Sequence, residues 1–312
     1  MSSTDLVKAM VYFSQTLIGT LGNLFLLCHC FYLHFTKFQL SSTNLILKHL
    51  AVANSLVILF RGVPETMAAL GLKDFLSDLG CKLVFYVHRI GRGVSIGNTC
   101  LLSVFQVITI CPINSRWAKL KSRTHKYVRI FSILCWIFHM LLSIIVPFCV
   151  TDKWHHINIT YQKEFGYCSS IHHKKSRTIM HTALLSLPDV LCVVLMLCTS
   201  SSMISILYRH NLRMQHMHMT NMTYRSSPET RATKTIILLV STFVCFYSLS
   251  LIFHAFFIFY NNPNRLLVCT AAVVTGSYAT VSPFLLMKHY PSISNLLDCI
   301  RKTKTCHIMR SI

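Results

Sequence analysis

The chain has 312 residues, of which 53% are hydrophobic and only 12% are charged. A soluble chain is about one quarter charged, so this composition excludes an ordinary soluble globule, and the surplus apolar surface is expected to face lipid. A formal net charge of +21 would suit a nucleic-acid partner, but the basic residues flank apolar runs without a zinc, homeodomain or RNA-binding signature. Attraction to anionic membrane lipid explains them better, and no nucleic-acid partner is expected.

Seven apolar stretches follow one another along the chain, each long enough to cross a hydrocarbon core of roughly 30 Å. A chain in lipid must satisfy its backbone hydrogen bonds internally, and the alternation of barrel strands is missing, so each stretch is predicted to be a helix. The predicted spans are 10–33, 43–70, 82–110, 128–150, 182–208, 235–260 and 267–287. We therefore expect a single all-α membrane domain over residues 1–312, a seven-transmembrane-helix bundle.

The distribution of Lys and Arg orients the predicted bundle. With the N-terminus outside the cell, the inner connections and tail hold about twice as many basic residues as the outer side. Cytoplasmic connections carry such an excess, so an extracellular N-terminus is predicted, although one outer connection of about 30 residues also contains a basic cluster. No cleavable signal peptide precedes the first span, which is expected to act as the membrane signal and to be retained.

Charged residues inside the spans are costly, by roughly 2.5 to 3.5 kcal/mol each at the centre of a helix, and normally face the bundle interior. Arg61 and Glu65 lie one turn apart in the second span, on one face and able to pair. His88, Arg89 and Arg92 lie about 7 to 11 residues inward of Cys81 in the third span, hence roughly 10 to 17 Å below its outer end at the rise of a helix. That is the depth of a ligand cavity.

Two further sets of polar residues complete the candidate site. Asp189 is the only acid of the fifth span, and its expected partner across the bundle is Arg89 or Arg92. Tyr247 and His254 belong to an aromatic and polar set in the sixth span, most of which is ascribed to helix packing. Either these charges line a cavity, or they form an internal ion-pair network that holds the helices together. The sequence leaves both interpretations open.

Long runs of the chain match a known family. They are LILKHLAVANSLVILFRGVPETMAALG in the second span, GCKLVFYVHRIGRGVSIGNTCLLSVFQVITICPINSRWAKLK from the third, ILLVSTFVCFYSLSLIF in the sixth and TVSPFLLMKHY in the seventh. On these runs the chain resembles the vomeronasal type-1 receptors, a branch of the rhodopsin-like seven-helix G-protein-coupled receptors associated with pheromone detection. The resemblance covers nearly the whole chain.

Compared with the wider rhodopsin-like class, several motifs are altered. Gly22-Asn23 and Trp136 match the class. Asn54 stands where most members have Asp, which argues against a bound sodium ion, and Phe105-Gln106-Val107 stands where Asp-Arg-Tyr is usual. The sixth span lacks the Trp-x-Pro motif. The departures suit the vomeronasal branch, and they leave the activation switches unassigned.

The resemblance also implies a disulfide and a type of pocket. Cys81 and Cys168 lie clearly on the outer, oxidising side and are expected to pair, with Cys149 and Cys269 near the outer span ends as alternatives. His88 occupies the position of the carboxylate in amine receptors of the same class. Together with Arg89 and Arg92 it suggests a pocket for anionic or polar-headed small molecules, bounded by the second, third, fifth and sixth spans.

The remaining predictions concern the connections and the tail. Asn158-Ile159-Thr160 is an outer glycosylation sequon, whereas the sequon at Asn221 lies inside and should be unmodified. Arg116, Lys119 and Arg231 belong to an inner basic rim that would contact a G protein, or simply membrane lipid. Residues 291–300 are expected to form a short amphipathic helix, and Cys299 within it and Cys306 beyond it are candidate palmitoylation sites.

The sequence contains no nucleophile triad, glycine-rich phosphate loop, paired-carboxylate site or zinc set, so an enzyme is not expected, nor is a cofactor or metal. By resemblance the protein is a plasma-membrane receptor of vomeronasal sensory neurons, which binds a small-molecule pheromone and activates an inhibitory-class heterotrimeric G protein. The alternative is a channel or transporter with a polar path through Arg61, Arg89, Arg92 and Asp189.

Overall fold

The computed structural model describes residues 3–36, 42–72, 75–110, 118–151, 162–164, 168–171, 175–217, 228–259 and 265–289. Several predicted features lie outside these residues, namely the sequon at Asn158, Arg116, the amphipathic segment 291–300 and the cysteines Cys299 and Cys306. For Lys119, Arg231 and His254 the helices are described and the side chains are not.

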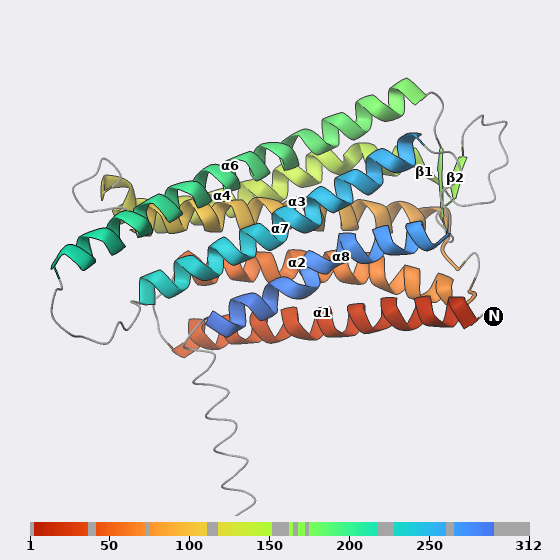
Figure 1. Cartoon of the computed structure of the whole chain (residues 1–312). Coiled ribbons are helices and arrows are strands. Elements are labelled where there is room, and N and C mark those ends of the chain that lie inside the picture. Colours follow the sequence, from red (N-terminus) through yellow and green to blue (C-terminus); the bar gives the residue numbers. More distant parts are fainter. Residues whose placement is uncertain are drawn as a thin grey trace, which may run out of the picture.

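Seven long helices form the bundle in the described part of the chain (Figure 1). They are α1 (Ser3–Thr36), α2 (Ser42–Ala69), α3 (Asp78–Ile110), α4 (Ala118–Leu142), α6 (Lys175–Met217), α7 (Pro228–Phe259) and α8 (Arg265–His289). All seven spans are long and apolar enough to cross a membrane. The predicted seven-helix membrane bundle is confirmed.

Most helices extend beyond the apolar spans, because charged and polar residues at a membrane boundary do not end a helix. The largest extension is in α6, which has 43 residues. The fourth span is instead interrupted near its end by the 3₁₀ turn η1 (Ser143–Ile145), followed by the short helix α5 (Val146–Cys149). Pro147 has no N–H to donate to the carbonyl of Ser143, which accepts the N–H of Val146 instead.

A small antiparallel sheet lies at the end of the bundle that carries the N-terminus (Figure 1). Its strands are β1 (Val150–Thr151), β2 (Gln162–Glu164) and β3 (Ser169–Ile171), in the order β1-β3-β2. Strands of two or three residues are too short for a hydropathy pattern to predict. Cys168 directly precedes β3 and is bonded to Cys81 of α3, with a Cα–Cα distance of 5.9 Å, which confirms the predicted disulfide. We call this end of the bundle the disulfide end.

Helix α3 lies at the centre of the bundle, and its glycines bring its neighbours close. In its most apolar window 56% of the residues are buried, against 11% for α6, so α3 faces other helices where α6 mostly faces outward. A Cβ at Gly93 would lie 2.1 Å from Nδ1 of His139, and one at Gly97 2.4 Å from Sγ of Cys135, both on α4. Only glycine at these two positions lets α4 pack this closely.

Uncharged hydrogen bonds tie α3 to α2 and α8 in the middle of the bundle. Asn54 of α2 accepts a bond of 2.6 Å from the hydroxyl of Ser95 and donates one of 2.9 Å to the hydroxyl of Ser282 on α8. Asn23 of α1 donates to the backbone carbonyl of Ala279 on α8. The Asn54 side chain therefore holds three helices together without a charge.

Candidate ligand site

A buried ion pair links α3 to α6. Nη1 of Arg89 lies 2.9 Å from Oδ2 of Asp189, and these side chains are 15% and 2% exposed. The guanidinium also donates to the backbone carbonyl of Leu185. Of the two partners that the sequence allowed for Asp189, the structure selects Arg89. The charge of Arg89 is thus neutralised by a helix at the edge of the bundle.

Arg92, one turn further along α3, has different surroundings. Its guanidinium carbon lies 5.3 Å from the centroid of the Tyr247 ring on α7, a cation–π distance. Among the described residues the ion pairs within 4.0 Å are Lys8–Asp5, Lys82–Asp78 and Arg89–Asp189, so Arg92 has no carboxylate partner there. Its charge rests against an aromatic face.

Tyr247 of α7 continues from Arg92 into a chain of aromatic contacts. Its ring stacks on Phe243 at 5.5 Å, and Phe243 meets Tyr278 of α8 edge-on at 4.7 Å. The Tyr278 hydroxyl is 2.6 Å from that of Thr99 on α3. These contacts connect Arg92 to the middle of α3 through α7 and α8.

The Tyr247 hydroxyl and Oδ1 of Asp189 are both buried, and neither makes a hydrogen bond in the described part of the chain. The two groups act on each other electrostatically. Unsatisfied buried polar groups are costly, so a donor and an acceptor left in this state favour any rearrangement that pairs them.

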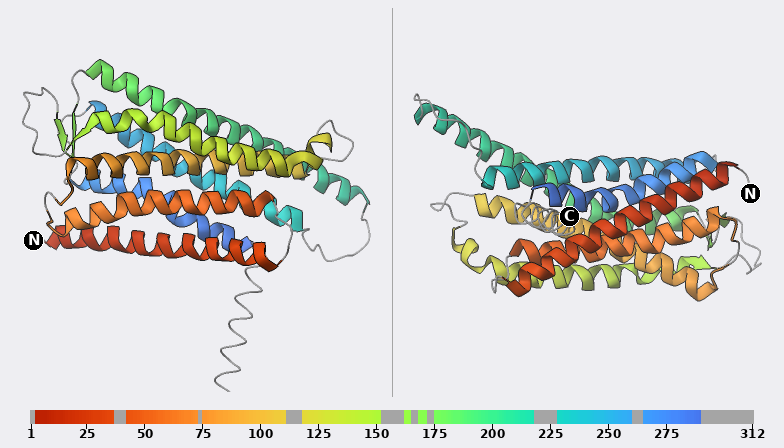
Figure 2. Two further views of the ribbon diagram at one scale, coloured as in Figure 1. Left: turned by 180° about the vertical axis from the view of Figure 1, so that it is seen from behind. Right: turned by 90° about the horizontal axis from the view of Figure 1, so that it is seen from below.

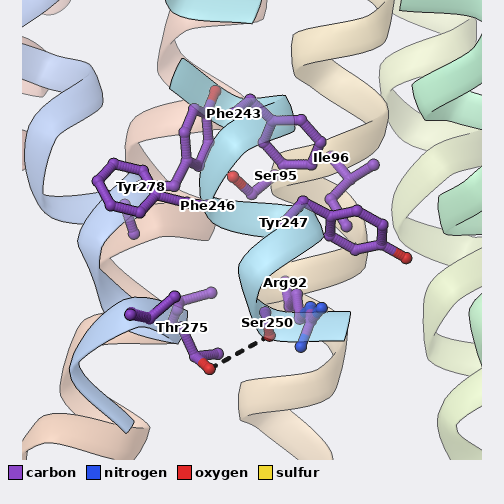
Figure 3. Close-up of a pocket in the computed structure, with 12 residues that line it drawn as sticks. Arg92, Ser95, Ile96, Phe243, Phe246, Tyr247, Ser250, Thr275 and Tyr278 are labelled. Carbon is purple, nitrogen blue, oxygen red and sulfur yellow. Dashed lines mark hydrogen bonds between the residues drawn. The ribbon is translucent and has the colours of Figure 1, made fainter. Parts of the chain in front are cut away.

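A cavity of about 40 Å³ opens beside Arg92 (Figure 3). Arg92 lies at the same end of it as Ser250 and Thr275, whose hydroxyls are 3.3 Å apart, whereas the rings of Phe243 and Tyr278 lie at the other end. The lining residues come from α2, α3, α7 and α8, and are Val57, Arg92, Ser95, Ile96, Phe243, Phe246, Tyr247, Ser250, Val274, Thr275, Tyr278 and Ala279. The fourth wall of the cavity is therefore the seventh span, α8, whereas the sequence predicted the fifth span, α6.

The other predicted site residues lie around this cavity. His88 and Arg89 do not line it, and both are partly buried on α3. Arg61 and Glu65 make no ion pair within 4.0 Å in the described residues, so the pairing predicted from their spacing is absent there. Glu65 remains within electrostatic reach of Arg61 and also lies near Tyr12 of α1, whose hydroxyl contacts Cys269 on α8. Arg61 acts electrostatically on Arg92.

Tyr247 was among the residues named from the sequence, whereas the lining residues Phe243, Ser250, Thr275 and Tyr278 were missed although their spacing carries a signal. Phe243, Tyr247 and Ser250 follow one another at four and three residues, and Thr275 and Tyr278 at three, so each set shares one face of its helix. The sequence gives these faces but does not indicate toward which neighbour they turn.

Known proteins resemble this chain over nearly its whole length. Residues 7–299 match the model of the vomeronasal organ pheromone receptor family. The chain belongs to this family. It is 51% identical to vomeronasal type-1 receptor 3 of Homo sapiens over 297 residues, 95% of each chain, and 52% identical to vomeronasal type-1 receptor 4 of Homo sapiens over 280 residues, 90% of this chain and 93% of the other. An olfactory receptor class A-like protein 1 of Danio rerio is 26% identical over 294 residues, 94% of this chain and 92% of the other.

Membership of a vomeronasal receptor family makes the chain a membrane receptor rather than an enzyme. Members of such a family bind small ligands and act through G proteins, so the cavity is a candidate site for a small ligand. The resemblance seen in the sequence is confirmed at the level of the family.

Proposed function

We propose that this vomeronasal receptor binds a small semiochemical in the cavity beside Arg92 and activates a heterotrimeric G protein of the inhibitory class. The observation that carries the proposal is the position of Arg92, a cation without a carboxylate partner among the described residues, in a cavity with aromatic walls. A few polar groups among apolar ones is the usual composition of a ligand site. The ligand in this proposal has an anionic or polar head and an apolar body.

The size of the cavity supports a receptor that changes shape on binding. Ligand pockets usually measure about 300 to 1,000 Å³, and the cavity measures about 40 Å³. A semiochemical would therefore have to separate α7 and α8 from α3 around Tyr247 and Tyr278. A ligand that binds only the opened arrangement shifts the equilibrium toward it, and the change is transmitted to the far end of the bundle.

The proposal places the disulfide end outside the cell, in the plasma membrane of vomeronasal sensory neurons. A disulfide persists in an oxidising compartment, and the bond between Cys81 and Cys168 lies at the end that carries the N-terminus. The rim containing Arg116, Lys119 and Arg231 would then face the cytoplasm, where it would meet the G protein.

Glycosylation tests this orientation. Asn158 should carry glycan and Asn221 should not, so Asn158→Gln should raise the mobility of the protein on a gel as much as glycosidase treatment does. Asn221→Gln is the matched control and should leave mobility unchanged. Glycan on Asn221 would invert the orientation and contradict the proposal.

Calcium imaging of cells expressing the receptor, with a panel of volatile and sulfated small molecules, tests the function. Co-expression with an inhibitory-class α subunit should permit a response, and the toxin that ADP-ribosylates this class should abolish it. A ligand-gated current that persists in the presence of the toxin would favour a channel instead. The polar residues Arg61, Arg89, Arg92 and Asp189 would then mark a conduction path.

A further inference from the structure

The charges in the interior of the bundle do not balance. Three guanidinium groups, those of Arg61, Arg89 and Arg92, face the two carboxylates of Glu65 and Asp189. Of these five groups, Arg89 and Asp189 alone form an ion pair within 4.0 Å in the part of the chain that the structure describes. The arrangement therefore holds an excess of one positive charge in a region from which water is largely excluded, and such a charge is costly unless an anion accompanies it.

Of these three arginines, Arg92 lines a cavity that is large enough to hold an ion. The cavity beside Arg92 measures about 40 Å³, and a single water needs about 10 to 15 Å³ by a comparable measure. A halide ion, which is somewhat larger than a water molecule, fits without movement of the helices. A whole semiochemical does not.

Ser250 supplies a second donor at the same end of the cavity (Figure 3). The Thr275 hydroxyl donates to the backbone carbonyl of Ala271 at 2.7 Å, so in the 3.3 Å contact between Ser250 and Thr275 the donor is Ser250. A bond of that length is weak, and the hydroxyl can turn to an anion instead. The guanidinium of Arg92 and the hydroxyl of Ser250 then act on the anion from two helices.

We propose that Arg92 of α3 and Ser250 of α7 form a binding site for one monovalent anion inside the bundle. The anion is either a free halide, chloride in the body, or the carboxylate or sulfate head of an organic ligand. The chemistry is the same in both cases, since a single negative charge accepts hydrogen bonds from a guanidinium and a hydroxyl. The site does not depend on coupling to a G protein, so it stands or falls separately from the proposed signalling.

The test uses the full-length receptor in nanodiscs of neutral phosphatidylcholine, with thermal unfolding followed by tryptophan fluorescence. Bromide replaces gluconate at constant ionic strength. A ligand that binds only the folded state raises Tm with its concentration, by about 2 °C or more well above its dissociation constant. Arg92→Gln should abolish this rise, and Ser250→Ala should move its midpoint to about tenfold higher bromide, as expected for one lost hydrogen bond to a charge.

Lys48→Gln is the matched control. It also removes one positive charge, but Lys48 lies over Phe31 of α1, far along α2 from the cavity, so the rise should persist. The proposed site would be overturned if Tm rose with bromide in Arg92→Gln as much as in the wild type. It would also be overturned if Lys48→Gln abolished the rise of Tm. If Arg92→Gln does not fold, binding of radioactive iodide to the wild type, Arg92→Lys and Ser250→Ala decides, with weaker binding expected in both variants and equal binding contradicting the proposal.

A second arm separates the two sources of the anion. Butyrate is compared with the uncharged butyramide, and methyl sulfate with methanol, under the same conditions. A rise with butyrate or methyl sulfate but not with bromide, lost in Arg92→Gln, would assign the site to the head of an organic ligand. No rise with any of these anions would overturn the proposal.

Discussion

Arg89 and Arg92 lie one turn apart on the same helix and have opposite environments. Arg89 is held by a carboxylate of α6, a helix that mostly faces outward. Arg92 is held by an aromatic ring of α7 and lines a cavity. The contrast suggests a division of roles: we propose that Arg89 supports the fold through its ion pair and that Arg92 contributes to a ligand site. The following predictions test that division.

The largest effect is expected from Asp189→Ala. It leaves the guanidinium of Arg89 buried and without its partner, which costs about 3 to 5 kcal/mol, so the amount of receptor at the cell surface should fall severely. The double variant Arg89→Met/Asp189→Leu removes both charges and should recover most of it. Surface labelling of intact cells measures both. Normal surface delivery of Asp189→Ala would show that the pair does not support the fold.

Arg92→Ala should affect the response and not the fold. We expect potency for an anionic agonist to fall more than tenfold, the equivalent of losing a hydrogen bond to a charged group, while surface labelling stays within twofold of the wild type. Arg92→Lys should restore only part of the potency, because the planar fork is lost. A loss of surface delivery that a second change at Glu65 or Asp189 restores would instead place Arg92 in the supporting network.

Asn54→Ala tests whether uncharged bonds hold the bundle as the ion pair does. It removes the bonds to Ser95 and Ser282 and should cost about 2 kcal/mol, at about 1 kcal/mol for each bond. Ser55→Ala is the control, because the Ser55 hydroxyl donates to the carbonyl of Ala51 within its own helix and, among the described residues, not to another helix. Thermal unfolding of the purified variants gives the difference. Equal Tm values would mean that the Asn54 network contributes nothing.

The smallest effect is expected from Tyr247→Phe. The ring over Arg92 remains, and the hydroxyl that is lost makes no hydrogen bond in the described residues. The free energy of unfolding should therefore change by no more than about 0.5 kcal/mol, with a correspondingly small change in Tm. Tyr247→Leu removes the ring and should cost about 0.5 to 2 kcal/mol. If both variants lose the response to agonist equally, the hydroxyl is required in the active arrangement, where the unsatisfied Oδ1 of Asp189 is a candidate acceptor.

The spans were predictable because the thickness of a bilayer sets the length of an apolar run, whatever the packing. The disulfide was predictable from the family, since Cys81 and Cys168 occupy its usual places. The walls of the cavity were not, because the rotation of each helix depends on contacts such as that of Gly93 with His139, which hydropathy does not contain. For the same reason the spacing of Arg61 and Glu65 placed them on one face of α2 but not in contact.

The length of α6 gives the Arg89–Asp189 pair a mechanical meaning. At a rise of 1.5 Å per residue its 43 residues span about 64 Å, and Figure 2 shows it reaching beyond the other helices at the end opposite the sheet. Asp189 lies about 21 Å from the helix start and about 42 Å from its end, next to Pro188, which interrupts the backbone ladder. If α6 pivots as a rigid rod at Asp189, the part that runs away from the disulfide end is about twice as long as the part that runs toward it. A displacement of α6 at the disulfide end would then be doubled, and reversed in direction, at the opposite end of the helix.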